Sequence, residues 1–580
     1  MQRWLLALGL GFITVWASAQ PQNPEPASGY ATKAATSFKR QAVSAAHPLA
    51  AEAGLRILRA GGNAVDAAVA VQMVLGLVEP QSSGIGGGAF LLHFDGRQVQ
   101  TYDGRETAPA AATPELFLRD GRPMPMREAV QSGLSAGVPG AIAMLALAHE
   151  RQGQLAWARL FEPAIELAER GFAITPRLHT LLKGDAALKR DAQARALYYD
   201  AAGQALPVGH VLRNPAYAEV LRRVAKSGPK AFYEGEVAAD IVRRLRAHER
   251  PGVMTKTDLA AYRPLERPPM CNTWRELRLC GMGPPSSGHV ALMQMLTLLE
   301  ASAPAAEPED AWLHRMIEAT KLAFADRAQY LADPAFAPAP GGDWQTLLAP
   351  DYLRERATLI GPRAMPPAAA GQPAPQRTAY APQAQQLESG TSHVSIVDAK
   401  GHAVAMTTSV ESAFGNRVMS DGGTGLAGGF LLNNQLTDFS LAPTGADGRP
   451  VANRVEPGKR PRSSMTPTLV FKGERLVLVA GSPGGPAIIP FMTRFLTGHL
   501  VGGLPAQAAA ELPHLINFNG PEVYLEAGRF SAAQREALQA RGHKVAEFAL
   551  PSGIQALSRL QGDSWAGAAD PRREGVSVGD

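Results

Sequence analysis

Apolar positions recur with the period of a helix along much of the first two thirds of the chain. Between residues 49 and 60 they predict an amphipathic helix that ends at Gly61-Gly62. Asn63 is a suitable cap for a second helix over residues 64–77. That segment is apolar on nearly every side, so we expect it to be buried. Helical patterns rich in Ala, Leu and Arg continue from 139 to about 360.

Short alternating segments occur in pairs, and each pair surrounds a turn sequence. They predict three β-hairpins, which join residues 89–94 to 98–102, residues 392–397 to 402–409, and residues 468–471 to 476–480. Hairpins in a chain that is otherwise rich in helix predict an α+β fold, in which helices cover sheets.

A low-complexity stretch separates the helical part from the second hairpin. Residues 364–386 are mostly Ala, Pro and Gln, a composition typical of a flexible tail or linker. Thr391 follows this stretch by only a few residues, at the start of the strand pattern. The chain of 580 residues is long enough for one large domain or several.

The first residues have the organisation of a secretory signal peptide. Arg3 precedes an apolar stretch from Trp4 to Trp16, and Ala17-Ser18-Ala19 matches an A-x-A cleavage site. We therefore expect residues 1–19 to be removed on export, most simply to a periplasm, so that the mature chain begins near Gln20. The alternative is an uncleaved membrane anchor, although the stretch is short for a bilayer and no later segment offers a membrane span.

Composition excludes some partners. The net charge of +5 arises from 109 charged residues without a run of Lys and Arg, so a nucleic-acid partner is not expected. The 13 His are scattered without the spacing of a metal site, so we expect no metal and no other cofactor.

The two cysteines flank a candidate hairpin. If Arg275-Glu276 is a two-residue turn, Trp274 faces Leu277, and counting outward Cys271 faces Cys280. Such a pair has Cα atoms close enough for a disulfide, which an oxidising compartment allows. Two separate buried thiols remain the alternative, because Arg-Glu is an unusual two-residue turn.

Thr391 is the candidate nucleophile. A four-residue hairpin loop places residue 397 opposite 402, so that Thr391 faces 408, whereas a one-residue bulge would place it opposite Ser409. If the chain is cut after Gly390, the new α-amino group of Thr391 can accept the proton of its own hydroxyl. The spacing alone is only suggestive, because Thr at a strand start is commonly structural.

Two glycine-containing motifs each allow a functional and a structural interpretation. Gly484 and Gly485 lie in a turn between a strand and a helix, where backbone N–H groups can form an oxyanion hole or simply a tight turn. Ser135 lies in a G-x-S-x-G sequence, but residues 126–132 do not form a convincing strand, so an α/β-hydrolase nucleophile is not favoured.

Taken together, the motifs resemble the γ-glutamyltranspeptidase family over almost the whole mature chain. In order along the sequence they are AHPLA (46–50), GGNAVDAA (61–68), EPQSSGIGGG (79–88), YDGRE (102–106), GVPG (137–140), PPSSG (284–288), TSHVS (391–395), LLNNQ (431–435), DFS (438–440), PRSSM (461–465) and GSPGG (481–485). So many long motifs in one order make a chance match negligible.

The resemblance implies an N-terminal nucleophile hydrolase, a four-layer αββα sandwich that cuts itself into a large subunit (20–390) and a small subunit (391–580). It implies that Thr391 attacks γ-glutamyl amides such as glutathione, and that water or an amino acid then accepts the acyl group. The implied roles at matching positions are a hydrogen bond to the nucleophile from Ser409, an oxyanion hole at Gly484 and Gly485, α-carboxylate binding by Arg105, Ser463 and Ser464, and α-amino binding by Gln435 and Asp438.

Two positions and one segment depart from familiar members of the family. Ser409 stands where many relatives have Thr, and Glu411 stands where they have Asn near the α-amino group. An extra carboxylate there could strengthen ammonium binding or favour another acyl group. No aromatic residue lies between Phe439 and Ser463, so a Tyr-latched lid looks absent and an open site for bulky donors is expected.

Two other functions remain open. An enzyme on the same scaffold could use another substrate, as a glutaryl-type acylase or a poly-γ-glutamate depolymerase would. A periplasmic binding protein that has lost activity would keep the chain in one piece. Arg105, Asp438 and the Ser463-Ser464 pair favour the amino-acid head group of a γ-glutamyl donor.

Overall fold

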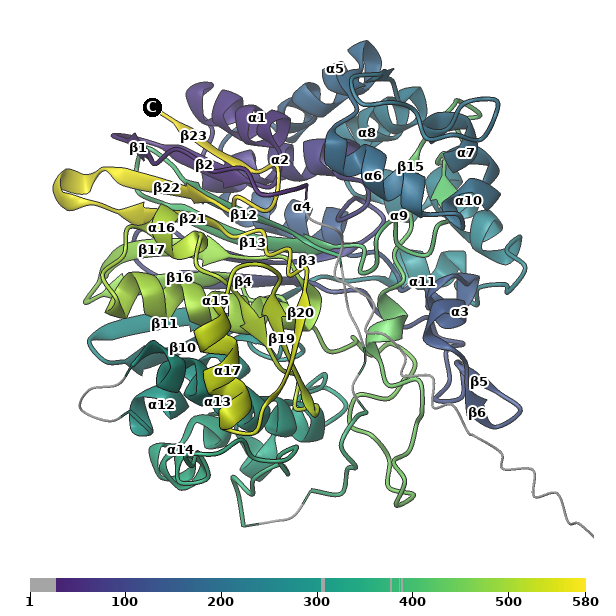
Figure 1. Ribbon diagram of the computed structural model, residues 1–580. Coiled ribbons are helices and arrows are strands. Elements are labelled where there is room, and N and C mark those ends of the chain that lie inside the picture. Colours follow the sequence, from purple (N-terminus) through teal and green to yellow (C-terminus); the bar gives the residue numbers. More distant parts are fainter. Residues whose placement is uncertain (1–27, 304–307, 376–377, 385, 387–389) are drawn as a thin grey trace, which may run out of the picture.

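The computed structural model describes residues 28–303, 308–375, 378–384, 386 and 390–580. The expected signal peptide lies outside these residues. Within them, helices and strands alternate in the mixed fold that the sequence predicts, and two large antiparallel sheets form the centre (Figure 1).

The first sheet contains the candidate nucleophile region. Its order is β23 (Val576–Gly579), β2 (Ala42–Ala45), β12 (Ser392–Val397), β13 (Ala403–Ser409), β3 (Gly88–Phe94), β4 (Val99–Gly104) and β9 (Leu265–Arg267). The β12–β13 hairpin is therefore central, between β2 and β3, which come from the beginning of the chain.

The second sheet packs against the first. Its order is β1 (Thr36–Phe38), β22 (Trp565–Ala569), β21 (Gln555–Arg559), β17 (Arg475–Gly481), β16 (Thr468–Lys472), β11 (Leu277–Gly281) and β10 (Met270–Trp274). Strands β17 and β21 contact β12 across the interface, and the apolar core there includes Phe90, Leu92 and Val479.

Helices lie on the outer side of each sheet (Figure 1). Beside the first sheet are α1 (Pro48–Arg59), α2 (Ala64–Val78), α4 (Ala141–Gln152), α5 (Glu162–Arg170), α8 (Pro215–Ser227) and α10 (Gly235–Arg246). Beside the second are α12 (Gly288–Ala301), α13 (Glu309–Tyr330), α14 (Pro350–Ala357), α15 (Ile488–Leu496) and α16 (Ala506–Ala510). Shorter elements are α3 (Met126–Val130), α6 (Pro176–Gly184), α7 (Ala192–Tyr198), α9 (Lys230–Tyr233), α11 (Lys256–Ala261), β5 (Leu118–Arg119), β6 (Arg122–Pro123), β7 (Phe172–Ala173), β8 (Val211–Leu212), β14 (Met419–Ser420) and β15 (Phe430–Leu431).

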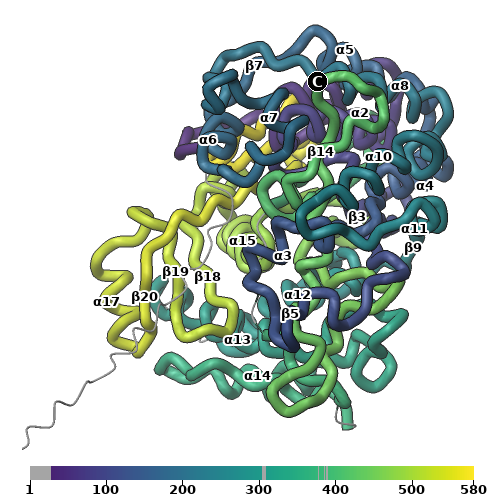
Figure 2. The backbone as a smooth tube through the Cα atoms, turned by 90° about the vertical axis from the view of Figure 1, so that its right-hand side faces the viewer, coloured from purple at the N-terminus to yellow at the C-terminus, as the bar shows by residue number. Residues whose placement is uncertain are grey.

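A small lobe projects from one side of the molecule (Figure 2). It consists of β18 (Leu515–Ile516), β19 (Glu522–Glu526), β20 (Lys544–Phe548) and α17 (Ala532–Ala540), and α17 packs on α13.

Helix α2 confirms the prediction of a buried helix. Every residue from Ala64 to Val78 is buried. Asn63 accepts hydrogen bonds from the N–H groups of Val65 and Asp66, and Asp66 accepts one from the N–H of Asn63. This reciprocal cap satisfies backbone donors that the buried helix start could not expose to water.

The three predicted hairpins are present, but the assumed register of the β12–β13 pair is wrong. Val397 pairs with Ala403 rather than with residue 402. The loop has a fifth residue because the carboxylate of Asp398 accepts the N–H groups of both Lys400, at 2.9 Å, and His402, at 3.0 Å. Ser392 therefore pairs with Thr408, and Thr391 faces Ser409, as the bulged alternative had it.

The cysteine hairpin has the expected register. Trp274 pairs with Leu277 and Cys271 with Cys280, at the edge of the second sheet. The two sulfurs form a disulfide. The unusual turn is accommodated because Arg275 adopts a φ of +55°, in the left-handed region.

The stretch from 364 to 386 is irregular, as its composition predicts, but it is not a free linker. Its described residues follow α13, where Gly371 N donates to Asp326 at 2.9 Å and Gln383 N donates to the carbonyl of Ala328 at 2.9 Å.

In the part of the chain that the structure describes, no helix combines the length and apolar character that crossing a bilayer requires.

Candidate functional site

Thr391 and Ser409 lie opposite each other where the central hairpin of the first sheet ends. Their hydroxyl oxygens are 3.4 Å apart, and both side chains are buried. Ser409 Oγ donates to the carbonyl oxygen of Gly390 at 2.9 Å, and the Thr391 hydroxyl also donates to that oxygen. Two hydroxyl groups thus converge on the carbonyl of the peptide bond that precedes Thr391.

The chain on the other side of this bond is also fixed. Arg573 Nη1 donates to the carbonyl oxygen of Thr391 at 3.3 Å, and Ser392 Oγ donates to Glu79 Oε2 at 2.8 Å. Glu79 is buried, with the Nε of Arg177 3.6 Å from its second oxygen. Glu79 is the first residue of the EPQSSGIGGG motif. No sequence signal indicates a role for Arg573.

Gly484 and Gly485 form the turn between β17 and the helical segment that leads into α15. Their φ values are +133° and +56°, a region that favours glycine. A Cβ on Gly484 would also lie 2.8 Å from the ring of Phe491. Within the described residues, neither N–H group takes part in the hydrogen bonds of the neighbouring strand or turn. Both are therefore available to a ligand at this turn.

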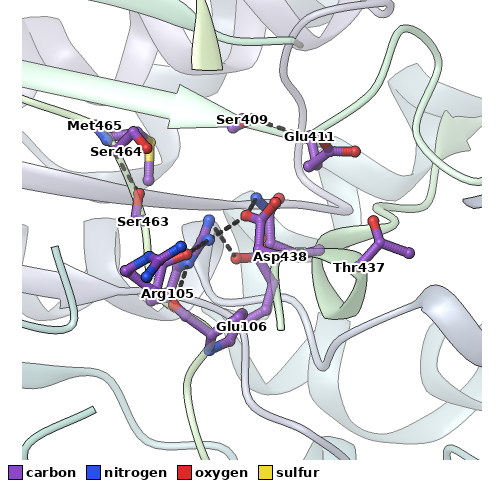
Figure 3. Close-up of polar contacts among 12 residues, drawn as sticks. Arg105, Glu106, Ser409, Glu411, Thr437, Asp438, Ser463, Ser464 and Met465 are labelled. Carbon is purple, nitrogen blue, oxygen red and sulfur yellow. Dashed lines mark hydrogen bonds and ion pairs between the residues drawn. The ribbon is translucent and has the colours of Figure 1, made fainter. Parts of the chain in front are cut away.

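A buried ion pair lies below Ser409 (Figure 3). Arg105, which follows β4, donates through Nη2 to Asp438 Oδ2, and both side chains are at most 3% exposed. Arg105 also donates to the carbonyl oxygens of Pro461, at 3.1 Å, and Arg462, at 2.8 Å. Gln435 Nε2 donates to the same Asp438 oxygen at 2.9 Å. This arrangement offers one positive and one negative group side by side.

Ser463 and Ser464 are held by the segment that precedes α12. Ser463 N donates to the carbonyl of Pro285 at 2.9 Å, and the Ser463 carbonyl accepts from Ser287. Arg327, on α13, donates to Ser464 Oγ at 2.6 Å and to Ser287 Oγ at 2.9 Å. Sequence reasoning missed Arg327, because an Arg inside a long helix carries no local signal.

Glu411 occupies the loop after β13 with a φ of +75°. Its N–H donates to Ser409 Oγ at 2.9 Å, so the loop also orients that hydroxyl. Its carboxylate accepts from Ser412 Oγ at 2.6 Å and from the side-chain amide of Asn434.

Glu106, beside Arg105, is an acid of the site whose pKa is raised far above its ordinary value. It is fully buried, and neither of its carboxyl oxygens has a hydrogen-bond partner among the described residues. Burial raises the pKa of Glu106 to about 8, although the Arg105 guanidinium 3.8 Å away acts in the opposite direction. Glu106 is the last residue of the YDGRE motif, but the sequence alone indicates no role for it.

The predicted site residues surround one small cavity of about 10 Å³. Those that line it are Arg105, Thr391, Ser409, Glu411, Gln435, Asp438, Ser463, Ser464 and Gly485, and Gly484 is adjacent in the chain. No residue between 440 and 462 lines it, whereas Arg449 and Arg462 line a neighbouring cavity of about 590 Å³. The cysteine pair lies apart from this site, on β10 and β11.

The G-x-S-x-G sequence is not a nucleophile elbow. Helix α3 precedes it instead of a strand, and Ser135 lies in a single helical turn, Gly133–Ser135. The buried hydroxyl of Ser135 donates to the carbonyl oxygens of Val130 and Ser132.

Known proteins match this chain over nearly its whole length. The model of the gamma-glutamyltranspeptidase family matches residues 50–579. The glutathione hydrolase proenzyme of Bacillus subtilis (strain 168) is 34% identical over 551 residues, which are 93% of this chain and 91% of that protein. The acylase ACY 1 proenzyme of Pseudomonas sp. (strain V22) is 35% identical over 549 residues, 92% of each chain. The crystal structure of a cephalosporin acylase from Bacillus halodurans superposes with a TM-score of 0.83 at 28% identity, covering 96% of this chain and 99% of that one. With the family model covering nearly the whole chain, the protein belongs to the γ-glutamyltranspeptidase family.

Proposed function

We propose that the protein is a γ-glutamyl hydrolase and transferase that acts on glutathione and related γ-glutamyl amides after cutting itself between Gly390 and Thr391. The observation that carries the proposal is the convergence of the Thr391 and Ser409 hydroxyls on the carbonyl of Gly390. The arrangement of a buried Arg beside a buried Asp in the same cavity supports the choice of substrate.

Self-cleavage would begin with attack of Thr391 Oγ on the carbonyl carbon of Gly390. The carbonyl oxygen would gain negative charge, and the Ser409 hydroxyl, already 2.9 Å away, would stabilise it. The C–N bond would break, the hydroxyl proton would pass to the departing nitrogen, and an ester would join Gly390 to Thr391 Oγ. Water would then hydrolyse the ester and leave Thr391 with a free α-amino group.

Turnover would reuse the same hydroxyl. The α-amino group of Thr391, with an ordinary pKa near 8, would accept the proton as Oγ attacks the γ-carbonyl of the donor. The N–H groups of Gly484 and Gly485 would stabilise the oxyanion. The leaving amine would take the proton, and water or the amine of an amino acid would release the γ-glutamyl group from the acyl-enzyme.

The head group of the donor would fit the charges of the cavity. Its α-carboxylate would bind Arg105 together with Ser463 and Ser464, and its α-ammonium would bind Asp438, Gln435 and Glu411. Removing the Arg105–Asp438 ion pair from water is costly, but a zwitterionic ligand gives each of the two groups a second opposite charge.

A same-scaffold acylase is the second candidate, and the acylase relative and the cephalosporin acylase structure favour it. A glutaryl donor has the carboxylate but no ammonium, so it would leave Asp438 without its counter-ion from the ligand. The buried carboxylate therefore supports the γ-glutamyl donor over the glutaryl one.

The remaining features are proposed on the same basis. The two sheets covered by helices support a four-layer αββα sandwich of the N-terminal nucleophile type. Residues 20–390 would form the large subunit and 391–580 the small one, paired in the mature enzyme. The signal sequence and the disulfide support export, in keeping with a periplasmic enzyme.

A denaturing gel tests the cut. From a chain of 61.3 kDa, the mature protein should give bands of about 39 and about 20 kDa, at this chain's own mean mass per residue. Thr391→Ala should give a single band near the full mass. An active, folded enzyme that remains in one piece would refute the proposal.

The substrate is tested separately with two chromogenic amides. We expect faster hydrolysis of γ-glutamyl-p-nitroanilide than of glutaryl-p-nitroanilide, and no hydrolysis of either by Thr391→Ala. Faster hydrolysis of the glutaryl compound would establish the acylase alternative while leaving the self-cleavage chemistry intact.

A further inference from the structure

Three side chains of the types that bind metal ions lie close together, far from the candidate active site. His314 and Glu318 lie one turn apart on the same face of α13, and His543 lies in the turn between α17 and β20. Figure 2 shows α17 and β20 in the small lobe and α13 beside it. All three are buried. His314 Nδ1 is 2.8 Å from His543 Nε2, and one ligand atom from each of the three residues lies within 4.8 Å of the other two.

Each of the α13 ligands is oriented by a second contact. His314 Nε2 lies 2.8 Å from the carbonyl oxygen of Gly361, which fixes the proton on Nε2 and leaves a lone pair on Nδ1. Glu318 Oε2 accepts from Met365 N at 2.7 Å, and Oε1 accepts from Lys321 Nζ at 2.8 Å. Because a carboxylate has about four acceptor positions, Glu318 retains lone pairs for a metal. Such outer contacts orient the ligands of known metal sites.

We propose that His314, Glu318 and His543 form a site for a divalent transition-metal ion of the Zn²⁺ class. Two imidazoles and one carboxylate suit Zn²⁺, Co²⁺, Ni²⁺ or Cu²⁺, whereas Mg²⁺ and Ca²⁺ need more oxygen ligands than these residues supply. With Zn–N bonds of about 2.0–2.1 Å, tetrahedral geometry separates the two nitrogens by about 3.3 Å. The rings must therefore part by about 0.5 Å, and the ring proton of His543 moves to Nδ1.

The ammonium of Lys321 limits the affinity. It is hydrogen-bonded to Glu318 and to the carbonyl of Met365 at 2.6 Å, and it repels a second cation. It also holds the carboxylate in place. The site is thus expected to be weaker than one built from the same three ligands without a neighbouring cation.

The ion would connect parts of the chain on either side of Thr391. His314 and Glu318 precede the proposed cut, and His543 follows it. Arg327, which contacts the candidate active site, is thirteen residues from His314 on the same helix, about 20 Å at the helical rise. The metal would therefore join the two proposed subunits and would not take part in the reaction. Spacing analysis could not find this site, because His543 is 225 residues from Glu318.

Metal stoichiometry tests the site directly. The full-length protein is stripped with EDTA, dialysed against ZnCl₂ and analysed for bound zinc. We expect one Zn²⁺ per chain in the wild type and in His210→Ala, which removes an exposed histidine elsewhere. We expect the bound zinc to be lost in His543→Asn and in His314→Asn, which keep a polar side chain for hydrogen bonding.

Thermal unfolding with and without Zn²⁺ provides a second measurement. The midpoint should rise with zinc in the wild type and in His210→Ala, and should not respond in either Asn variant, provided that the variants fold as judged by circular dichroism without metal. The proposal is overturned if the wild type binds no zinc at this site, or if both Asn variants retain the bound ion. The latter result would mean that the two rings form only a hydrogen-bonded pair.

Discussion

Replacing Glu106 by Gln should make the stability of the protein less dependent on pH. The carboxyl group is fully buried without a hydrogen-bond partner among the described residues, and burial raises its pKa from 4.5 to about 8. Below pH 4.5 the group is protonated in both the folded and unfolded states. As the pH rises from 4.5 to about 8, only the unfolded state loses the proton, so stability is lost over this window and levels off above it.

The size of the effect follows from linkage. Each pH unit in the window costs about 1.4 kcal/mol of unfolding free energy, or about 5 kcal/mol in all. Unfolding of 580 residues has an entropy of about 1.2 kcal/mol/K, so the unfolding midpoint of the wild type should fall by about 4 °C relative to Glu106→Gln between pH 4.5 and pH 8. Because Gln is uncharged at every pH, the Glu106→Gln variant does not lose unfolding free energy in this way.

Calorimetry at half-unit steps from pH 4.5 to 9 measures the difference. Both proteins should carry Thr391→Ala, so that a single uncut chain unfolds in each case. Glu115→Gln serves as the control, because Glu115 is exposed. A constant midpoint difference between Glu106→Gln and its parent across the whole range would refute the reasoning, since it would mean that Glu106 is not kept neutral by burial.

Three further predictions concern the site and the disulfide. Ser409→Ala removes the donor to the Gly390 carbonyl and should slow self-cleavage by about 10²–10³-fold, while Ser409→Thr retains it; a gel time course of the precursor decides. Asp438→Asn should reduce kcat/KM for γ-glutamyl-p-nitroanilide by about 10–100-fold but affect glutaryl-p-nitroanilide much less, and an equal loss on both would contradict ammonium binding. Joint replacement of Cys271 and Cys280 by Ser opens a short loop and should lower the unfolding free energy by about 2–3 kcal/mol. The thermal unfolding midpoint should then be about 2 °C lower. An unchanged midpoint would show that the β10–β11 pairing alone constrains this loop.

Local patterns predicted those elements whose causes are local. The buried helix α2 followed from its uniform apolar composition and its Asn63 cap, and the Cys271–Cys280 register followed from counting outward from one turn. The β12–β13 register was wrong by one residue because the side chain of Asp398 enlarges the loop. A side-chain contact of this kind changes loop length without changing the alternation of the strands.

Site residues that lie within motifs could be predicted from the sequence. Site residues outside the motifs, which reach the site from distant parts of the chain, could not. Nine residues named from the sequence line one cavity. Arg327 and Arg573, which contact Ser464 and the Thr391 carbonyl, were not identified, because each lies far along the chain from its partner. The raised pKa of Glu106 was not predicted for another reason. Its pKa depends on complete burial, which no motif reports.

The central position of the β12–β13 hairpin has a consequence for the proposed self-cleavage. Strand β12 pairs with β2 and strand β13 with β3, so the residues after Thr391 enter a sheet whose neighbouring strands come from the first hundred residues. The hydroxyls of Thr391 and Ser409 can meet at Gly390 only once this pairing is complete. A cut at that bond would therefore occur only in molecules that have already folded, and the two products would remain interlocked, unable to separate without dismantling the sheet.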